Sequence, residues 1–229
     1  MHNLFFFFQA KAKSKATEEA GQSLVDIIIN SGPMGIVIFG ILLVLSVLAL
    51  YIFIERWLTI KKAGKVDDQF INNIRAAVQA GNIEGAKALC ATTNTPTSRM
   101  VEKGIMRIGK PLKDIDAAIE NVGNLEIFKL EKNLSTLASI AGAAPMIGFL
   151  GTVTGMILAF YTMSSEDNVS PTVLAGGIYQ ALLTTAFGLF VGIVAFVGYN
   201  LLVANVEKVV FKMERTTMEF MDLLQEPTA

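Results

Sequence analysis

Three polar side chains interrupt an uncharged, apolar stretch of this sequence: Gln180, Thr184 and Thr185, within GGIYQALLTTAFGLFVG at residues 176–192. A primary amide has more donors and acceptors than its own helix can satisfy, so Gln180 should face protein, water or an interface rather than lipid. Gln180 and Thr184 lie about one helical turn apart, and small residues continue beside them. The spacing therefore predicts a narrow, partly hydrated groove lined by hydrogen-bonding groups.

A second uncharged segment, ASIAGAAPMIGFLGTVTGMILAF at residues 138–160, carries a matching stripe of small residues around Thr152. Small residues let helix backbones approach closely where lipid provides no hydrophobic drive for association. Pro145 removes a backbone hydrogen bond and predicts a kink. Packing alone also accounts for these residues, and a single membrane threonine often bonds its own helix. The positions expected at the helix contact are Gly148, Gly151, Gly155, Gly188 and Gly192.

Composition indicates a membrane protein and excludes several kinds of chemistry. Of the 229 residues, 52% are hydrophobic and 17% are charged, whereas soluble domains carry about a quarter charged residues. A net charge of −1 gives no reason to expect a nucleic-acid partner. Cys90 is the only cysteine and His2 the only histidine, which argues against a disulfide within the chain, a zinc site or histidine catalysis. We predict no catalytic residue, no metal and no enzyme activity.

Three segments reach the roughly 20 apolar residues needed to cross a bilayer. They predict an all-α integral membrane protein with three transmembrane helices and long helices extending into the cytoplasm. Lysines and arginines follow the first segment, precede the second and follow the third, whereas the turn between the second and third holds only acidic charge, which predicts an N-terminus outside the cell membrane and a cytoplasmic C-terminus. The boundaries we expect are an N-terminal extracytoplasmic segment with an amphipathic helix at 1–32, transmembrane helices at 33–55, 134–163 and 172–205, a cytoplasmic helical region at 56–133, a periplasmic turn at 164–171 and a C-terminal cytoplasmic helix at 206–229.

The polar region between the first two spans is predicted to form several helices. GN at 81–82 ends one of them, and NTPTS at 94–98 is interpreted as a helix cap rather than a phosphorylation site. From Leu112 onward, the pattern predicts one helix of about 50 residues that enters the second span, with Gly123 as a point where it could bend.

The N-terminus allows more than one interpretation. MHNLFFFF is too short for the apolar core of a signal peptide, and fits either the remnant of a longer leader or a short membrane-touching patch. SLVDIIIN, just before Pro33, suits an amphipathic helix on the outer leaflet, and an ordinary connector fits equally well.

GFLGTVTGM in the second span and ALLTTAFGLFVGIVAFVGYN in the third closely resemble the MotA/TolQ/ExbB proton-channel family. The three-span layout and GNIEGAKALC are most similar to its ExbB branch, and the resemblance covers roughly residues 24–215. It implies a homopentamer of the bacterial inner membrane whose second and third spans line a pore. It also implies an ExbD-like single-span partner that supplies an essential aspartate, and a TonB-like protein that passes the work to outer-membrane import.

The resemblance gives roles to two threonines. A threonine of the GTVxGM run and one of the ALxTT run face the partner's aspartate in the family, and these fall on Thr152 and Thr185. Gln180 departs from the pattern, because many ExbB and TolQ members carry a glutamate just before ALxTT. We therefore expect Thr152, Thr185, Gln180 and Thr184 to line a proton pathway whose titrating group comes from the partner. Sodium is the alternative ion.

Two other functions stay open from the sequence. One is a TolQ-like stator for envelope maintenance, and the other is a non-conducting membrane scaffold that organises a partner through its glycine faces. No cofactor is expected. A bound phospholipid, with membrane lipid as a partner, would suit glycine-faced helices beside long aliphatic stretches, but nothing in the sequence selects a headgroup.

Overall fold

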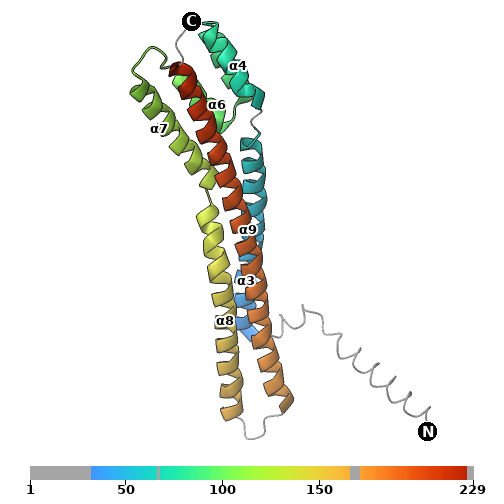
Figure 1. Ribbon diagram of the computed structural model, residues 1–229. Coiled ribbons are helices and arrows are strands. Elements are labelled where there is room, and N and C mark those ends of the chain that lie inside the picture. The colour runs from blue at the N-terminus through green and yellow to red at the C-terminus, as the bar shows by residue number, and fades with distance from the viewer. Residues whose placement is uncertain (1–31, 66–67, 166–170, 226–229) are drawn as a thin grey trace, which may run out of the picture. The chain divides into compact units, whose positions relative to one another are not determined.

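A computed structural model describes residues 32–65, 68–165 and 171–225, and every regular element in these ranges is an α-helix (Figure 1). The predicted amphipathic helix and the MHNLFFFF patch lie outside the described residues. The helices are α3 (Gly32–Ala63), α4 (Asp68–Gln79), α5 (Ile83–Thr93), α6 (Pro96–Ile105), α7 (Leu112–Glu131), α8 (Leu134–Ser165) and α9 (Pro171–Gln225).

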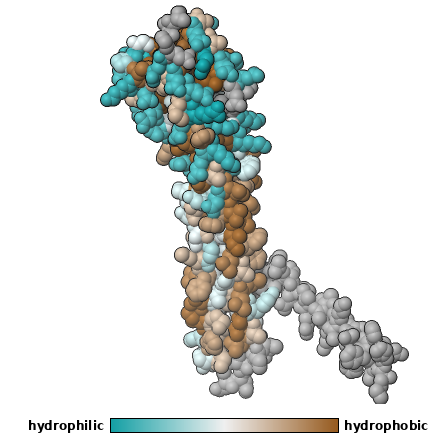
Figure 2. All heavy atoms as spheres, in the orientation of Figure 1, coloured by the Kyte–Doolittle hydropathy of each residue, from teal (hydrophilic) through white to brown (hydrophobic). Residues whose placement is uncertain are grey.

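Three helical stretches are long and apolar enough to cross a membrane, which confirms the all-α fold with three spans. They are α3, the stretch containing α7 and α8, and α9. Large apolar side chains are exposed along them, among them Leu43, Phe149 and Phe190. In the view of Figure 2, hydrophobic side chains cover much of these spans, and hydrophilic side chains gather over α4–α7. Exposed apolar surface of this extent is suited to contact with lipid or with other membrane helices.

The prediction of an unbroken helix from Leu112 into the second span is wrong. Helix α7 ends at Glu131, Lys132 leaves the helical region with ψ of 134°, and Asn133 adopts a left-handed φ of 64°. Asparagine tolerates this conformation better than most residues, so it can separate two helices without a glycine. Gly123 lies inside α7 and is buried, where an added Cβ would come within 2.9 Å of the Met100 methyl carbon. Its small size therefore serves packing rather than a bend.

The chain divides into two compact units, described separately. The first comprises residues up to Ser46 together with Gly142–Ile193, and the second comprises Val47–Ala141 together with residues from Val194 onward. Helices α3, α8 and α9 contribute to both.

Helices α8 and α9 of the first unit approach each other through glycines. A Cβ added to Gly188 would lie 2.6 Å from the carbonyl oxygen of Ala144 and 2.8 Å from the Cα of Gly148. A Cβ added to Gly155 would lie 2.9 Å from that of Ala181. Backbone-to-backbone contact of this kind is what small residues permit in membrane helices.

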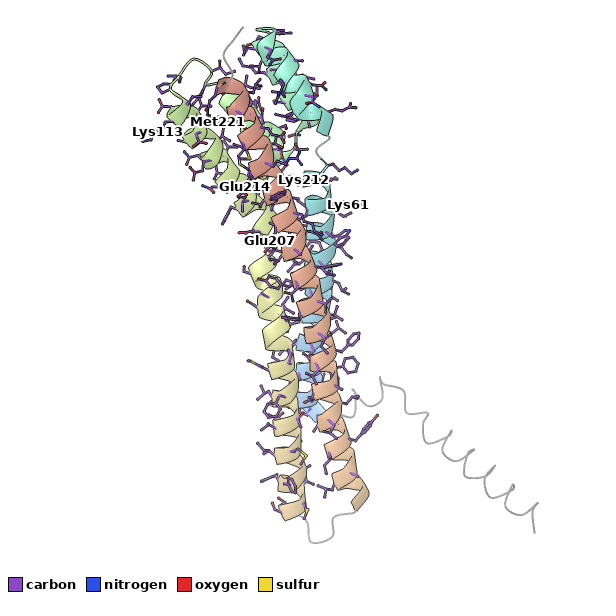
Figure 3. The ribbon with its side chains drawn as sticks, viewed as in Figure 1. Lys61, Lys113, Glu207, Lys212, Glu214 and Met221 are labelled. Atoms are coloured by element: carbon purple, nitrogen blue, oxygen red, sulfur yellow. The ribbon has the colours of Figure 1, made fainter. Side chains whose placement is uncertain are left out.

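The second unit contains a core around α6, α7 and the C-terminal part of α9. Phe220, Ile105 and Ile119 are almost completely buried there, and full burial of such a side chain contributes about 1.5–3 kcal/mol. Gly104 allows α6 close to this cluster, since a Cβ would meet the Phe220 ring at 2.6 Å. Charged side chains including Lys113 and Glu214 project from its helices (Figure 3).

NTPTS caps a helix as predicted. Thr95 is the N-cap of α6, its hydroxyl oxygen accepts from the Ser98 backbone N–H, and the Ser98 hydroxyl oxygen accepts from the Thr95 N–H. Pro96 occupies the first turn, where its missing N–H has no cost. Thr97 and Ser98 are buried, which agrees with a structural role for this segment.

Candidate functional site

The structure brings Thr152 of α8 and Thr185 of α9 together. Their hydroxyl oxygens are in direct hydrogen-bonding contact. The Thr152 hydroxyl also lies 2.9 Å from the carbonyl oxygen of Ala181, and the Thr185 hydroxyl 3.1 Å from that of Gly148, so each hydroxyl can donate either to its carbonyl or to the other hydroxyl. Each hydroxyl has one proton and two acceptors within reach, so the direction of donation within the pair can reverse. Both side chains are half-buried, which leaves the pair within reach of a further group.

Thr184, the neighbour of Thr185, is placed differently. It is 2% exposed, and its hydroxyl donates to Ala181 O at 2.7 Å with a longer contact to Gly148 O at 3.3 Å. A Cβ added to Gly151 would lie 2.5 Å from the Thr184 oxygen, so the two helices close tightly around this side chain. In this packed position Thr184 stabilises the contact between α8 and α9.

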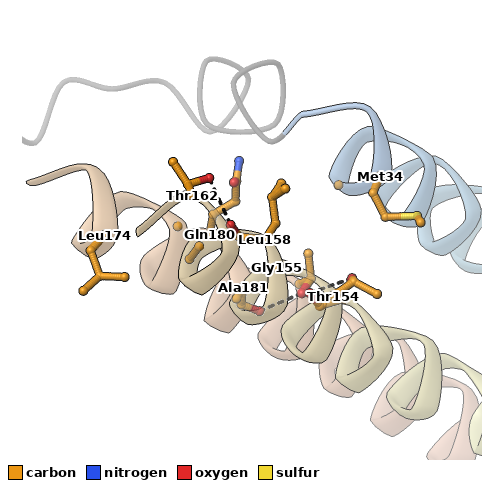
Figure 4. Close-up of a pocket in the computed structure, with 13 residues that line it drawn as sticks. Met34, Thr154, Gly155, Leu158, Thr162, Leu174, Gln180 and Ala181 are labelled. Atoms are coloured by element: carbon orange, nitrogen blue, oxygen red, sulfur yellow. Dashed lines mark hydrogen bonds between the residues drawn. The ribbon is translucent and has the colours of Figure 1, made fainter. Parts of the chain in front are cut away.

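Gln180 lines a pocket of about 160 Å³ in the first unit, between α8, α9 and the N-terminal turn of α3 (Figure 4). Thr154 and Thr162 of α8 also line it, and Met34 comes from α3. The hydroxyls of both threonines donate to carbonyls of their own helix, to Leu150 O at 2.9 Å and to Leu158 O at 3.0 Å. Most of the lining is apolar, and Gln180 adds a side-chain amide to it, while Thr154 and Thr162 are engaged within their own helix.

Thr152 opens onto a second hollow, distinct from the pocket of Gln180. Every residue that lines this hollow lies on α8: Thr152, Val153, Met156, Ile157, Phe160, Tyr161 and Ser164. We call it the α8 groove. Of the four polar residues that the sequence suggested as one pathway, the structure therefore joins Thr152 with Thr185 and places Gln180 and Thr184 on the lining of the other pocket.

The remaining residues singled out in the sequence lie inside the same two helices. Pro145 is within α8 and half-buried. Gly148, Gly151, Gly188 and Gly192 are buried, and Gly155 is half-buried against Ala181.

The described part of the first unit contains no residue that exchanges a proton near neutral pH. Residues 32–46, 142–165 and 171–193 hold no aspartate, glutamate, lysine, arginine or histidine. Nor do the described residues contain a cluster of three His, Cys, Asp or Glu side chains able to hold a metal ion. Hydroxyl and amide groups in these ranges can orient water or relay a proton, but they do not titrate near neutral pH.

A buried charge cluster on α7, outside the span of 134–163 expected from the sequence, was not predicted. The Glu126 side chain on α7 is 4% exposed, and its carboxylate accepts from Lys129 at 2.7 Å and from Arg99 of α6 at 2.5 Å. Burial raises the pKa of the Glu126 carboxyl, but the hydrogen bonds and charges of Arg99 and Lys129 outweigh it, so this pKa lies below its ordinary value. The spacing of Glu126 and Lys129 was a usable signal, whereas the contact to Arg99 crosses between helices.

Arg56 is a second buried charge that the sequence suggested only as a marker of topology. It is 5% exposed, and its guanidinium donates to the carbonyl oxygen of Lys129 at 3.0 Å and to the carboxylate of Glu55. An arginine can satisfy a carbonyl and a carboxylate at once because its donors point in fixed directions.

Comparison with known proteins identifies the family. A sequence model of the MotA/TolQ/ExbB proton channel family matches residues 92–215, more than half of the chain. This range contains α6, α7, α8 and most of α9, and therefore both Thr152 and Thr185.

Individual relatives carry two different names. An ExbB homolog from Methanothermobacter thermautotrophicus is 26% identical over 174 residues, covering 74% of this chain and 62% of the relative. The Tol-Pal system protein TolQ of Haemophilus influenzae is 40% identical over 86 residues, 38% of each chain. The biopolymer transport protein ExbB of Xanthomonas campestris is 35% identical over 86 residues, covering 38% of this chain and 34% of the relative. Each match covers less than two thirds of the relative's length. The chain belongs to the MotA/TolQ/ExbB proton channel family.

Proposed function

We propose that this chain is the ExbB-like channel subunit of a membrane motor which, with an ExbD-like single-span partner, uses the proton-motive force to energise TonB-dependent outer-membrane import. The observation that carries the proposal is the hydroxyl contact between Thr152 and Thr185 beside the α8 groove. Relatives named ExbB support the assignment.

The partner supplies the titrating carboxylate in this proposal. A charged aspartate facing bare membrane helix would cost at least about 2.5–3.5 kcal/mol. The hydroxyls of Thr152 and Thr185 lower that cost, because each can donate to a carboxylate or hold a water molecule against it. The α8 groove, with the exposed apolar side chains of Ile157 and Phe160, offers a surface for the partner helix.

The membrane potential supplies enough energy for such a motor. One elementary charge that crosses 100 mV yields about 2.3 kcal/mol. A few protons per step therefore provide the energy to rearrange a packed interface between the partner helix and the α8 groove.

The proposal includes an assembly and an orientation. The chain forms a homopentamer in the bacterial inner membrane, with the N-terminus in the periplasm, the region 56–133 and the C-terminus in the cytoplasm, and the connection between α8 and α9 on the periplasmic side. The asymmetric distribution of lysine and arginine in the sequence supports this orientation.

The test is proton uptake by liposomes under an imposed potential. We expect uptake from vesicles that hold the chain together with its partner, and none from vesicles that hold the chain alone. Replacing the partner's aspartate by asparagine should abolish the uptake while the complex still purifies. Uptake by the chain alone would contradict the proposal, because it would require a titrating group within this chain.

A TolQ-like role is the second candidate, because TolQ of H. influenzae is among the matched relatives. The two roles share the channel chemistry and differ in the partner that receives the work. Deletion of the gene would separate them: loss of receptor-dependent uptake supports the ExbB-like role, and leakage from the periplasm supports the TolQ-like role. A complex without flux for protons or sodium would favour the scaffold.

A further inference from the structure

A third pocket, of about 320 Å³, lies in the second unit between α3 and α9. We call it the lysine pocket. Its lining comes from α3 (Trp57, Ile60, Lys61 and Gly64) and from α9 (Leu202, Asn205, Lys208, Val209 and Lys212). The three lysines distinguish this pocket from those of the first unit, whose described linings carry no charged side chain.

The positive charge of the lysine pocket is not neutralised by neighbouring carboxylates of the described chain. No acidic residue lines the pocket, and no ion pair between described residues involves Lys61, Lys208 or Lys212. The helical repeat places Glu207 and Glu214 together on one face of α9, and Lys208 and Lys212 on another. Figure 3 shows Lys212 pointing away from both glutamates. Three amines around one hollow repel each other unless an anion lies between them.

One of the three amines is fixed in place by the backbone. Lys212 Nζ donates to the carbonyl oxygen of Gly64 at 3.2 Å, and a Cβ added to Gly64 would lie 3.4 Å from the Val209 side chain. This contact leaves two further ammonium donors of Lys212 free to bind an anion. The hydrogen bond therefore orients a donor group at the pocket without occupying it.

The rest of the lining is apolar. Ile60, Leu202 and Val209 are at most 5% exposed and form the floor, while Trp57 is 40% exposed. Toward the spans, the surfaces of both helices stay apolar and exposed, at Ile54 and Leu58 on α3 and at Leu201 on α9. Tryptophan and lysine at the end of an apolar run are typical of a membrane–water interface.

From this arrangement we propose that the lysine pocket binds the phosphate headgroup of an anionic phospholipid, with the acyl chains along the exposed apolar side chains of α3 and α9. The lysines contact the headgroup phosphate, and the apolar surface that continues from the pocket accounts for a ligand with hydrocarbon chains rather than a free anion. The inference depends on membrane insertion and is independent of proton transport.

Trp57 makes the site directly measurable, because it is the only tryptophan in the chain. The full chain is reconstituted into phosphatidylcholine vesicles in two preparations. One contains a small fraction of phosphatidylglycerol with brominated acyl chains, and the other contains the same fraction of phosphatidylcholine with brominated acyl chains. Trp57 fluorescence is recorded in both. We expect the brominated phosphatidylglycerol to quench at a mole fraction severalfold lower than brominated phosphatidylcholine, since juxtamembrane lysines each favour anionic lipid.

Two triple variants separate the pocket from general surface charge. Lys61→Gln with Lys208→Gln and Lys212→Gln should remove the preference, so that both lipids quench equally. Lys103→Gln with Lys110→Gln and Lys113→Gln removes the same charge from α6, α7 and the segment between them, and should leave the preference intact.

Three outcomes would overturn the inference. One is equal quenching of the unmodified chain by the two brominated lipids. Another is an equal loss of preference in both triple variants, which would indicate attraction to the whole surface. The third is loss of phosphatidylglycerol quenching on addition of inorganic phosphate at constant ionic strength, which would identify a free phosphate as the ligand. Circular dichroism of each variant verifies that the helices are intact.

Discussion

The guanidinium of Arg56, on α3, donates a hydrogen bond of 3.0 Å to the carbonyl oxygen of Lys129, in the last turn of α7. This carbonyl belongs to one of the last residues before the break at Lys132 and Asn133, where backbone oxygens lose their helical partners. The contact therefore stabilises the end of α7 just before α8 begins. Arg56 is 5% exposed, so water cannot easily replace it.

Replacing Arg56 should loosen the junction between α7 and α8. We expect Arg56→Met to lower the free energy of unfolding by roughly 2 kcal/mol, because a hydrogen bond from a charged donor is lost and a carbonyl is left unpaired. Hydrogen exchange followed by mass spectrometry should show faster exchange near residues 130–136. Arg56→Lys keeps the charge but not the donor geometry, and should restore little. Unchanged exchange in both variants would contradict this role.

Gly188 and Gly142 form a matched pair for testing the contact between α8 and α9. Gly188→Ala should destabilise the protein by about 1–3 kcal/mol, because overpacking forces neighbouring groups to move and the new Cβ would meet Ala144 O at 2.6 Å. Gly142→Ala should be neutral or nearly so, since an added Cβ there meets nothing within 4 Å. Thermal unfolding of both variants in detergent measures the difference. Equal melting temperatures would show that the helices can separate without loss.

The hydroxyl pair should be needed for flux and not for assembly. Thr184 also donates to Ala181 O, at 2.7 Å, and reaches Gly148 O, at 3.3 Å. In the double valine variant Thr184 therefore still donates to Ala181 O, and both carbonyls keep the backbone N–H donors of their own helices. We expect Thr152→Val with Thr185→Val to reduce proton uptake at least tenfold while the complex still purifies. A tenfold reduction corresponds to the loss of a polar interaction of about 1.4 kcal/mol.

Thr154→Val is the control for the hydroxyl pair. Its hydroxyl donates only to carbonyls of α8, at Leu150 and Gly151, so flux should be preserved. Loss of the complex in the double valine variant would indicate a structural role for the pair instead.

The charge cluster on α7 should give a stability that depends on pH. The Glu126 pKa is lower in the folded chain than in the unfolded chain, where it is near 4.5. Its ionised form therefore stabilises the fold above pH 4.5, and this contribution is lost as pH falls through the folded pKa. Glu126→Gln should cost roughly 2 kcal/mol at pH 7, and the difference from the unmodified chain should shrink below pH 4.5. Chemical denaturation at a series of pH values measures it, with exposed Glu120→Gln as the control.

Cys90 should be unreactive in the folded protein. The side chain is 1% exposed, and burial, with a smaller contribution from the charge of Glu102, raises the thiol pKa to about 12. A maleimide reacts with the thiolate, so labelling at pH 8 should be slow until denaturant is added. Ala91→Cys in a Cys90→Ser background places a thiol at the next, exposed position and should label quickly. Rapid labelling of native Cys90 would show that α5 opens readily.

The features that the sequence by itself determined are local. Three uncharged runs predict three spans because a bilayer requires a length of apolar chain, whatever its neighbours are. NTPTS predicts a cap because its hydroxyls bond backbone groups within three residues. The motifs around Thr152 and Thr185 were sufficient to indicate the family.

Only the tertiary structure decided which side chains meet. The rotation of α9 against α8 brings Thr185 into contact with Thr152 and places Gln180 on the lining of another pocket, although Gln180 and Thr185 are close in sequence. The break at Asn133 was missed because a left-handed asparagine needs support from surrounding contacts, here including that of Arg56 near the end of α7. The lysine pocket likewise combines residues more than 140 positions apart, as the bond from Lys212 to Gly64 records. Such contacts depend on the register between helices, and no local pattern encodes that register.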